Sequence, residues 1–182
     1  MEFTLRDFRP EDFDQLWQVD QDCFVPGIAY SRQELAAYIH RRGSFTLVAE
    51  AAVAKSARSH GNTALEAESE HDILGFIVAE ANRRIGHILT IDVPLASRRF
   101  GIGSKLLTAA EDRFRAVPCT GVVLETAVDN AAALAFYKRH GYDVVKTSPR
   151  YYSNGLDAFV LEKDLSSGPR TNRVRSNPTW EF

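Results

Sequence analysis

Apolar and polar positions change their spacing several times along the first part of the chain, and each spacing predicts one kind of element. Residues 3–8 predict a short edge strand. After Pro10, apolar side chains recur at near-helical spacing, which predicts an amphipathic helix that stops at Pro26-Gly27. The residues on this apolar stripe are Phe13, Leu16, Trp17 and Phe24.

A second helix is predicted to begin at Ser31. Its hydroxyl can cap the backbone, and Glu34, three residues later, completes a capping box. The buried stripe of this helix consists of Leu35, Tyr38 and Ile39. Gly43 ends the segment, and residues 44–50 are rich in side chains that favour strands.

The second half of the chain predicts a strand–loop–helix–strand unit followed by a helix and a hairpin. Strands are expected at 73–81 and 87–93 around a turn, a helix from Gly103, and a strand at 122–126. A further helix at 130–140 is closed by Gly141, where a left-handed cap is cheapest. Strands at 142–146 and 158–163 then frame an antiparallel hairpin.

Two segments lack a periodic pattern. Residues 54–72 are polar with few large apolar side chains, which predicts a solvated loop insert, the alternative being a partner-binding insert. Residues 166–182 mix Ser, Gly, Pro, Asn and Arg and predict a disordered tail, whose arginines would otherwise contact an acidic partner. The rest, residues 1–165, is expected to be a single domain.

Composition excludes several classes of protein. The chain has 182 residues, with 22 Lys and Arg against 24 Asp and Glu, so no overall positive field would hold nucleic acid or an anionic membrane. Its apolar stretches are much shorter than the roughly 20 residues of a membrane span. Residues 1–10 carry charges instead of an apolar signal core, so a cytoplasmic protein is expected. The two cysteines, Cys23 and Cys119, lack zinc or redox spacing and are expected to be small buried hydrophobic residues.

One loop could bind an anion. The segment Arg98-Arg99-Phe100-Gly101-Ile102-Gly103 lies between an apolar strand and a helix. Glycines there allow backbone N–H groups to turn inward, and the helix N-terminus adds partial positive charge, so the loop can hold phosphate oxygens. It matches neither a Walker loop nor G-x-G-x-x-G, and a plain tight turn is the alternative.

Further motifs follow this R-x-x-G-x-G loop: the run Asn130-Ala131-Ala132-Ala133-Leu134-Ala135-Phe136-Tyr137 and then His140-Gly141-Tyr142. In order and spacing the three resemble the acetyl-CoA signatures of the GNAT N-acetyltransferase superfamily. Leu124-Glu125 and the hairpin Tyr151-Tyr152-Ser153-Asn154-Gly155-Leu156-Asp157-Ala158 resemble the RimI/Ard1-like branch, which acetylates protein N-termini. The resemblance covers residues 3–165 apart from the insert.

The resemblance implies an α/β (α+β) GNAT fold: a mixed, mostly antiparallel sheet of six or seven strands, flanked by about four helices, with splayed central strands. It implies acetyl-CoA as cosubstrate, with the pyrophosphate on the glycine loop and the pantetheine paired to strand backbone. Asp92 departs from the small residue common at its position, and Pro94 comes one position early. The residues implied for the cofactor are Ile91, Asp92, Val93, Arg98, Arg99, Phe100, Gly101, Ile102, Gly103, Ser104, Asn130 and Tyr137.

Acetyl transfer from a thioester to an amine needs two proton transfers, because the ammonium must lose a proton and the departing thiolate must gain one. The resemblance assigns Glu125 as general base, directly or through water, and Tyr137 as general acid. Asn130 would hold the pantetheine or cap its helix. The substrate-binding residues implied are Phe24, Pro26, Tyr151 and Tyr152.

These patterns predict an acetyl-CoA-dependent N-acetyltransferase acting on the α-amine of a protein N-terminus, a ribosomal protein among the acceptors. The alternatives are acetylation of a small-molecule amine or a lysine side chain, and a non-catalytic module that binds acetyl-CoA. The five histidines form no spaced pair, so no metal site is predicted. Oligomeric state and the preferred N-terminal residue stay open.

Overall fold

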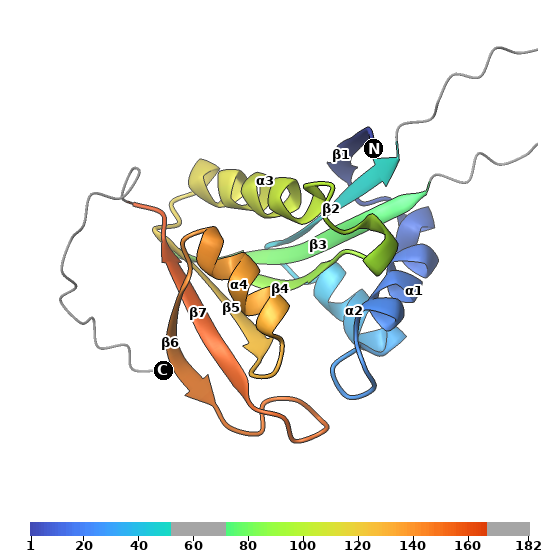
Figure 1. Ribbon diagram of the computed structural model, residues 1–182. Helices are drawn as coiled ribbons and strands as arrows, with labels where there is room; N and C mark the ends of the chain where they lie inside the picture. Colours follow the sequence, from blue (N-terminus) through green and yellow to red (C-terminus); the bar gives the residue numbers. More distant parts are fainter. Residues whose placement is uncertain (52–71, 167–182) are drawn as a thin grey trace, which may run out of the picture.

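The computed structural model describes residues 1–51 and 72–166, which form one seven-stranded sheet with helices on both faces (Figure 1). The predicted insert 54–72 and the predicted tail 166–182 lie outside the described residues, apart from Asp72 and Ser166. The strands are β1 (Phe3–Asp7), β2 (Ser44–Ala51), β3 (Ile73–Asn82), β4 (Ile85–Asp92), β5 (Gly121–Ala127), β6 (Asp143–Ser148) and β7 (Ala158–Asp164).

The sheet has the order β1-β2-β3-β4-β5-β7-β6. Neighbouring strands pair antiparallel except β4 and β5, which pair parallel and are joined through a helix. The mixed, mostly antiparallel sheet and the edge position of the first strand are therefore confirmed. The hairpin of β6 and β7 closes the other side of the sheet.

The helices lie on opposite faces of this sheet. Helices α1 and α2 cover one face, and α3 and α4 cover the other (Figure 1). Their bounds are α1 (Phe13–Cys23), α2 (Arg32–Ile39), α3 (Ile102–Ala116) and α4 (Ala131–Arg139), with short 3₁₀ turns at Pro10–Asp12 and Leu95–Ser97. Among the described residues, no helix is both long and apolar enough to cross a membrane.

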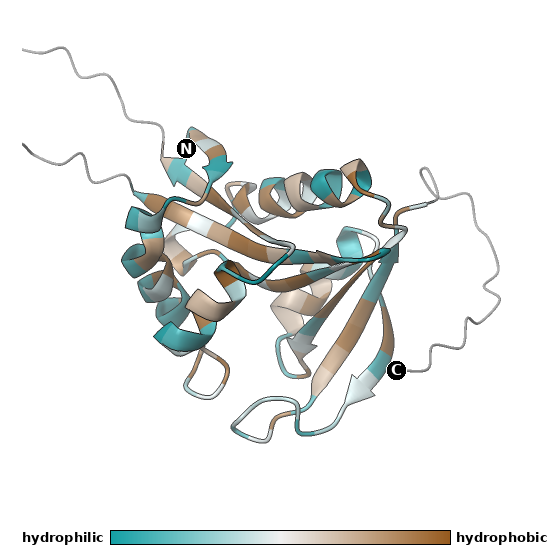
Figure 2. Cartoon of the chain, turned by 180° about the vertical axis from the view of Figure 1, so that it is seen from behind, coloured by the Kyte–Doolittle hydropathy of each residue, from teal (hydrophilic) through white to brown (hydrophobic). Residues whose placement is uncertain are grey.

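Each face of the sheet has its own hydrophobic core. Phe114 and Tyr137 belong to the core beneath α3 and α4, and Leu16 and Leu35 to the core beneath α1 and α2. Because β3 lies between the two cores, its first seven residues are all buried. Figure 2 shows hydrophobic residues along the inner strands and hydrophilic ones on the outer sides of the helices.

The helix ends follow the predicted local chemistry. The Glu34 amide donates to Ser31 Oγ, and the Ser31 amide donates to Glu34 Oε2, so the capping box is confirmed. Gly141 follows α4 with φ of 86°. Cys119 is buried, but Cys23 is only partly buried, so the expectation of two buried cysteines is wrong for Cys23, which lies at the last turn of α1.

Candidate active site

The two parallel strands separate before they end. Backbone pairing between β4 and β5 reaches only Ile88 opposite Leu124, although β4 continues to Asp92 and β5 to Ala127. Within these two fully described strands, no register pair lies beyond that point. The predicted splayed central strands are therefore confirmed, and the opening leaves the last four residues of β4 unpaired on the β5 side.

A bulge in β4 coincides with the start of this opening. Thr90 pairs with Val78 of β3, and Ile88 pairs with the next residue, Ala79, so Leu89 has no partner in register. A bulge bends its strand and increases the local twist. The Tyr30 hydroxyl donates to the Leu89 carbonyl oxygen at 3.1 Å and holds the bulged residue from the α1–α2 side.

The loop between β4 and α3 leaves helix N–H groups available. Gly101 is the N-cap residue of α3, with φ of 83°, and no side chain caps the helix. A Cβ atom at Gly101 would meet nothing within 4 Å, so the space in front of the first turn is open. Arg99 also has positive φ, at 68°. This geometry fits a pyrophosphate group, because uncapped N–H groups and the helix dipole both favour an anion there.

The side chains predicted to contact the cofactor are not equally placed to do so. Arg98 Nε donates to the Val93 carbonyl at 2.8 Å, which fastens the loop to the end of β4. Ile102 is 1% exposed and packs in the core beneath α3, so only its backbone faces the loop. The Asn130 side chain accepts from the Ala133 amide at 3.0 Å, which makes it the cap of α4. The cofactor contacts themselves stay a prediction.

Glu125 lies in a polar chain that runs across three strands. Its Oε2 is 2.7 Å from His87 Nε2 on β4. His87 pairs in register with Glu80 of β3, and the other ring nitrogen of His87, Nδ1, lies 4.0 Å from Glu80 Oε1. Arg41 lies 3.3 Å from Glu80. An imidazole hydrogen-bonded to a carboxylate can take up a proton at one ring nitrogen and release one from the other, so this chain suits proton transfer to and from Glu125.

Glu125 and Tyr137 lie on opposite faces of the sheet. Leu124 packs with Tyr137 in the core beneath α3 and α4, and successive residues of a strand alternate faces, so Glu125 projects toward the α1 and α2 face. Tyr137 is 6% exposed. Burial raises the pKa of its phenol above the usual range, so Tyr137 holds its proton at neutral pH.

Two loops meet beside Glu125 on the α1 and α2 face. Ser153 Oγ of the β6–β7 loop donates to the Gly27 carbonyl at 3.0 Å, and a Cβ at Gly27 would lie 2.8 Å from Asn154 Cβ. Burial, and next to it the Glu125 charge, raises the pKa of Tyr151 from the same loop. Burial raises the pKa of Tyr152 to about 12, with the Glu125 charge as the second cause. The four residues predicted to bind substrate, Phe24, Pro26, Tyr151 and Tyr152, thus lie in two loops that touch.

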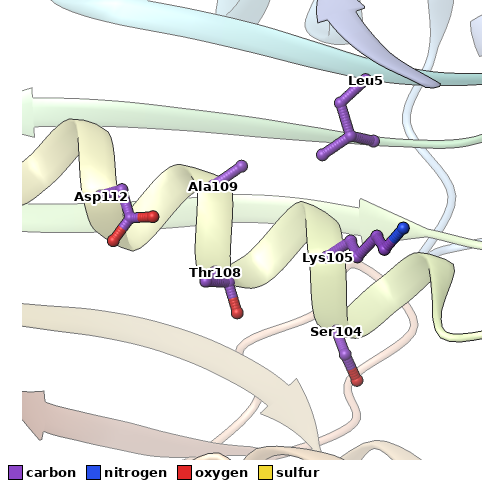
Figure 3. A pocket seen from close by; sticks show the side chains of 6 residues that line it. All are labelled: Leu5, Ser104, Lys105, Thr108, Ala109 and Asp112. Atoms are coloured by element: carbon purple, nitrogen blue, oxygen red, sulfur yellow. The ribbon is translucent and has the colours of Figure 1, made fainter.

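A shallow pocket between β1 and the outer side of α3 is separate from this opening. Its lining residues are Leu5, Ser104, Lys105, Thr108, Ala109 and Asp112, and Figure 3 shows Leu5 apart from the helix that carries the other five. Only Ser104 is among the predicted cofactor-binding residues. The lining carries neither Glu125 nor Tyr137, so we place the reaction at the strand opening. In the part of the chain that the structure describes, no group of three His, Cys, Asp or Glu side chains could hold a metal ion.

The comparison with known families decides the class of protein. Residues 3–142 match the model of the acetyltransferase (GNAT) family. The chain belongs to the GNAT family. The predicted superfamily is therefore confirmed, and the strand opening and the glycine loop are those of a GNAT acetyltransferase.

Curated relatives and a solved structure agree with this GNAT assignment. The chain is 36% identical over 106 residues to the uncharacterized N-acetyltransferase MJ1530 of Methanocaldococcus jannaschii, covering 57% of this chain and 68% of the relative. It is 42% identical over 74 residues to N-alpha-acetyltransferase 30 of Schizosaccharomyces pombe, covering 41% of this chain and 49% of that relative, or about half its length. The NatC complex bound to Gag peptide and CoA contains a chain with TM-score 0.70 and 26% identity, covering 91% of this chain and 99% of that one.

His87 is the residue of this GNAT site that sequence reasoning missed. As one of five histidines without a spaced pair, it carries no predicted role, although the strand predicted at 87–93 places it on the face opposite the apolar Ile88. Its contact with Glu125 depends on the register of β4 and β5, which no local pattern reveals.

Proposed function

We propose that this GNAT chain is an acetyl-CoA-dependent N-acetyltransferase that acetylates the α-amino group of a protein N-terminus by direct attack in a ternary complex. The observation that carries the chemistry is the placement of Glu125, bonded to His87, and Tyr137 on opposite faces of one strand opening. A proton acceptor on one side and a proton donor on the other are what the two proton transfers require.

The choice of an α-amine rests on two supports. Matched relatives are named N-alpha-acetyltransferase, one in Schizosaccharomyces pombe and one in Sulfurisphaera tokodaii. The contact between Gly27 and Ser153 also joins the two loops beside Glu125, and a chain end enters a site bordered by joined loops more easily than the middle of a chain does. The RimI-like assignment, a ribosomal-protein acceptor and a cytoplasmic location are parts of this proposal, the last supported by two free cysteines.

Acetyl-CoA supplies the activated acetyl group when bound. Backbone N–H groups at the start of α3 hold its phosphates, and the unpaired backbone of residues 89–92 orients the pantetheine arm. On the other face the acceptor enters as an ammonium, and Glu125 takes its proton, which His87 can carry toward Glu80. Tyr137 gives its proton to the leaving sulfur atom. No covalent bond to the protein is required.

The test measures thiol release from acetyl-CoA with three acceptors: a lysine-free peptide with a free N-terminus, an N-terminally blocked peptide with one lysine, and spermidine. Ribosomal-protein N-termini belong among the free peptides, and mass spectrometry locates the acetyl group. We expect acetylation of the α-amine alone. Turnover of only the lysine or spermidine would overturn the acceptor assignment, and a wild-type protein that binds acetyl-CoA but acetylates nothing would overturn the enzymatic one.

Matched carboxylate variants connect the activity to the site. Glu125→Gln removes the predicted base, whereas Glu162→Gln changes a carboxylate on the same sheet face, two residues along β7 from the register partner of Glu125. We expect a loss of at least tenfold in kcat for Glu125→Gln only. Equal activity of the two variants would contradict the assigned base.

A further inference from the structure

Asp92 places a carboxyl group inside the strand opening. It is the last residue of β4, four positions beyond the final pair with β5, and it is 1% exposed. Its register partner on β3 is Phe76, which packs in the core beneath α1 and α2. Because directly paired residues share a face, the Asp92 side chain lies on the same face as Glu125, on the opposite side of the opening.

The two oxygens of this carboxyl group differ. Asp92 Oδ1 accepts a hydrogen bond from Thr90 Oγ1 at 2.5 Å. Asp92 Oδ2 is fully buried and has no hydrogen-bond partner among the described residues. A buried polar atom without a partner is costly and rare in native proteins, so Oδ2 calls for a partner that binds in the working enzyme.

The surroundings of Asp92 disfavour a negative charge on its carboxyl group. Burial raises the pKa of Asp92 well above its usual range, and the nearby Asp20 carboxyl raises it further. Among the described residues, no Lys or Arg forms an ion pair with Asp92, and the nearby Arg98 donates instead to the Val93 carbonyl. A buried carboxyl group without a cationic partner favours its neutral form, and the proton then lies on Oδ2 because Oδ1 receives the Thr90 proton.

Three neighbouring groups, whose pKa values a charge on Asp92 would raise, show what lies around it. On the acceptor side, burial and, after it, a charge on Asp92 raise the pKa values of Cys23 from α1 and Tyr30 from the following loop. On the cofactor side, burial and then a charge on Asp92 raise the pKa of Tyr137 from α4. Asp92 is thus near Tyr137, the predicted general acid, and near Tyr30 of the acceptor-side loop, at the unpaired end of β4.

We propose that Asp92 is a third catalytic residue, a neutral acid whose Oδ2–H donates a hydrogen bond to the thioester carbonyl oxygen. This inference rests on the proposed acetyl transfer. When the amine forms its C–N bond, the carbonyl π electrons move to the oxygen, and the Asp92 O–H stabilises that charge without leaving Oδ2. The electrons then return, the C–S bond breaks and Tyr137 protonates the sulfur. The second amine proton goes to Glu125, whose first proton has left through His87, and Tyr137 regains a proton from solvent after the products leave. A carboxylic acid kept neutral by an apolar site is a known kind of oxyanion donor.

Two substitutions of Asp92 test whether it acts as a hydrogen-bond donor: Asp92→Asn keeps a donor without an ionisable group, and Asp92→Ala removes both. In Asp92→Asn the amide oxygen takes the Thr90 hydrogen bond, which places the Nδ2 donor where Oδ2 was. We expect the kcat of Asp92→Asn to stay within about fivefold of wild type and the kcat of Asp92→Ala to fall about 100-fold. The KM values of both variants should stay near wild type. Wild-type kcat in Asp92→Ala, or an equal loss in both variants, would overturn the proposal. If Asp92→Ala does not fold, a double variant replaces it. Thr90→Val added to Asp92→Asn removes the hydroxyl that orients the amide, so the amide group can rotate and no longer holds its N–H toward the carbonyl. This double variant must lose the activity that Asp92→Asn alone keeps.

Infrared spectroscopy gives readouts that do not depend on turnover. The wild-type protein should show a protonated carboxyl band at neutral pH that is absent from Asp92→Asn. With acetyl-CoA labelled at the carbonyl carbon, the bound carbonyl band should move to lower wavenumber in wild type and Asp92→Asn and move less in Asp92→Ala. A wild-type protein without the carboxyl band, or equal carbonyl shifts in all three, would overturn the role of Asp92. These bands are measured without an acceptor, so a failure of the proposed function is distinguishable from a failure of this inference.

Discussion

His87 Nε2 lies 2.7 Å from Glu125 Oε2, although the two residues are 38 positions apart and sit on different strands. The contact joins β4 to β5 at the point where their backbone pairing ends. It fixes the orientation of the Glu125 carboxylate at the mouth of the opening. It also gives that carboxylate a route for a proton toward Glu80 and the surface.

His87→Ala should lower kcat about tenfold because Glu125 loses its hydrogen-bond partner and the route for its proton. If the two residues act as one unit, the double variant with Glu125→Gln should be no slower than Glu125→Gln alone. Steady-state kinetics with a saturating peptide acceptor checks this, with acetyl-CoA binding as the test for an intact fold. Additive losses would show that His87 and Glu125 act independently.

Tyr137→Phe should reduce kcat about 100-fold while leaving acetyl-CoA affinity near wild type, because the change removes a proton donor and keeps the packing of the ring. Calorimetric binding of acetyl-CoA and single-turnover kinetics separate the two effects. Tyr142→Phe is the matched control, since the Tyr142 ring packs on Tyr137 but its hydroxyl donates to Glu111. Full turnover in Tyr137→Phe would remove Tyr137 from the mechanism.

Gly86→Ala should destabilise the protein by about 2 kcal/mol because overpacking a filled core displaces neighbouring side chains. The added Cβ would lie 2.6 Å from the Phe114 ring. Gly101→Ala meets no atom within 4 Å and should cost only about 1 kcal/mol, from its positive φ. Urea unfolding of both variants measures the difference. A smaller loss for Gly86→Ala than for Gly101→Ala would contradict the packing argument.

Asp20→Asn should change how stability depends on pH. Burial raises the pKa of Asp20 to about 6, above its value in the unfolded chain, so the native state binds more protons between those values. Stability from this group is present below about pH 4 and is lost as pH rises through 6, by up to about 3 kcal/mol. The Asn variant should therefore gain stability relative to wild type between pH 4.5 and 7.5, measured by urea unfolding. If the difference in free energy of unfolding between the two proteins stayed constant across that range, Asp20 would not titrate in this way.

Local sequence chemistry predicted much of the fold. The Ser31–Glu34 capping box, the Gly141 helix end and the strand character of 73–81 involve residues close together in the chain, so spacing alone carries the information. The order of the GNAT motifs then indicated a sheet with splayed central strands, which the pairing of β4 and β5 bears out. The assignments of Glu125 and Tyr137 as base and acid stay predictions.

The sequence by itself determined the elements, their order and the family, because caps, periodicity and glycine positions act within a few residues. Only the tertiary structure decided that His87 meets Glu125 and that Ile102 turns into the core. It also decided that Asp92 is buried, with one carboxyl oxygen that has no hydrogen-bond partner among the described residues. Those facts depend on strand register, on the Leu89 bulge and on which side chains exclude water from the opening. Register and burial are set by contacts between distant parts of the chain, and these contacts leave no local pattern to read.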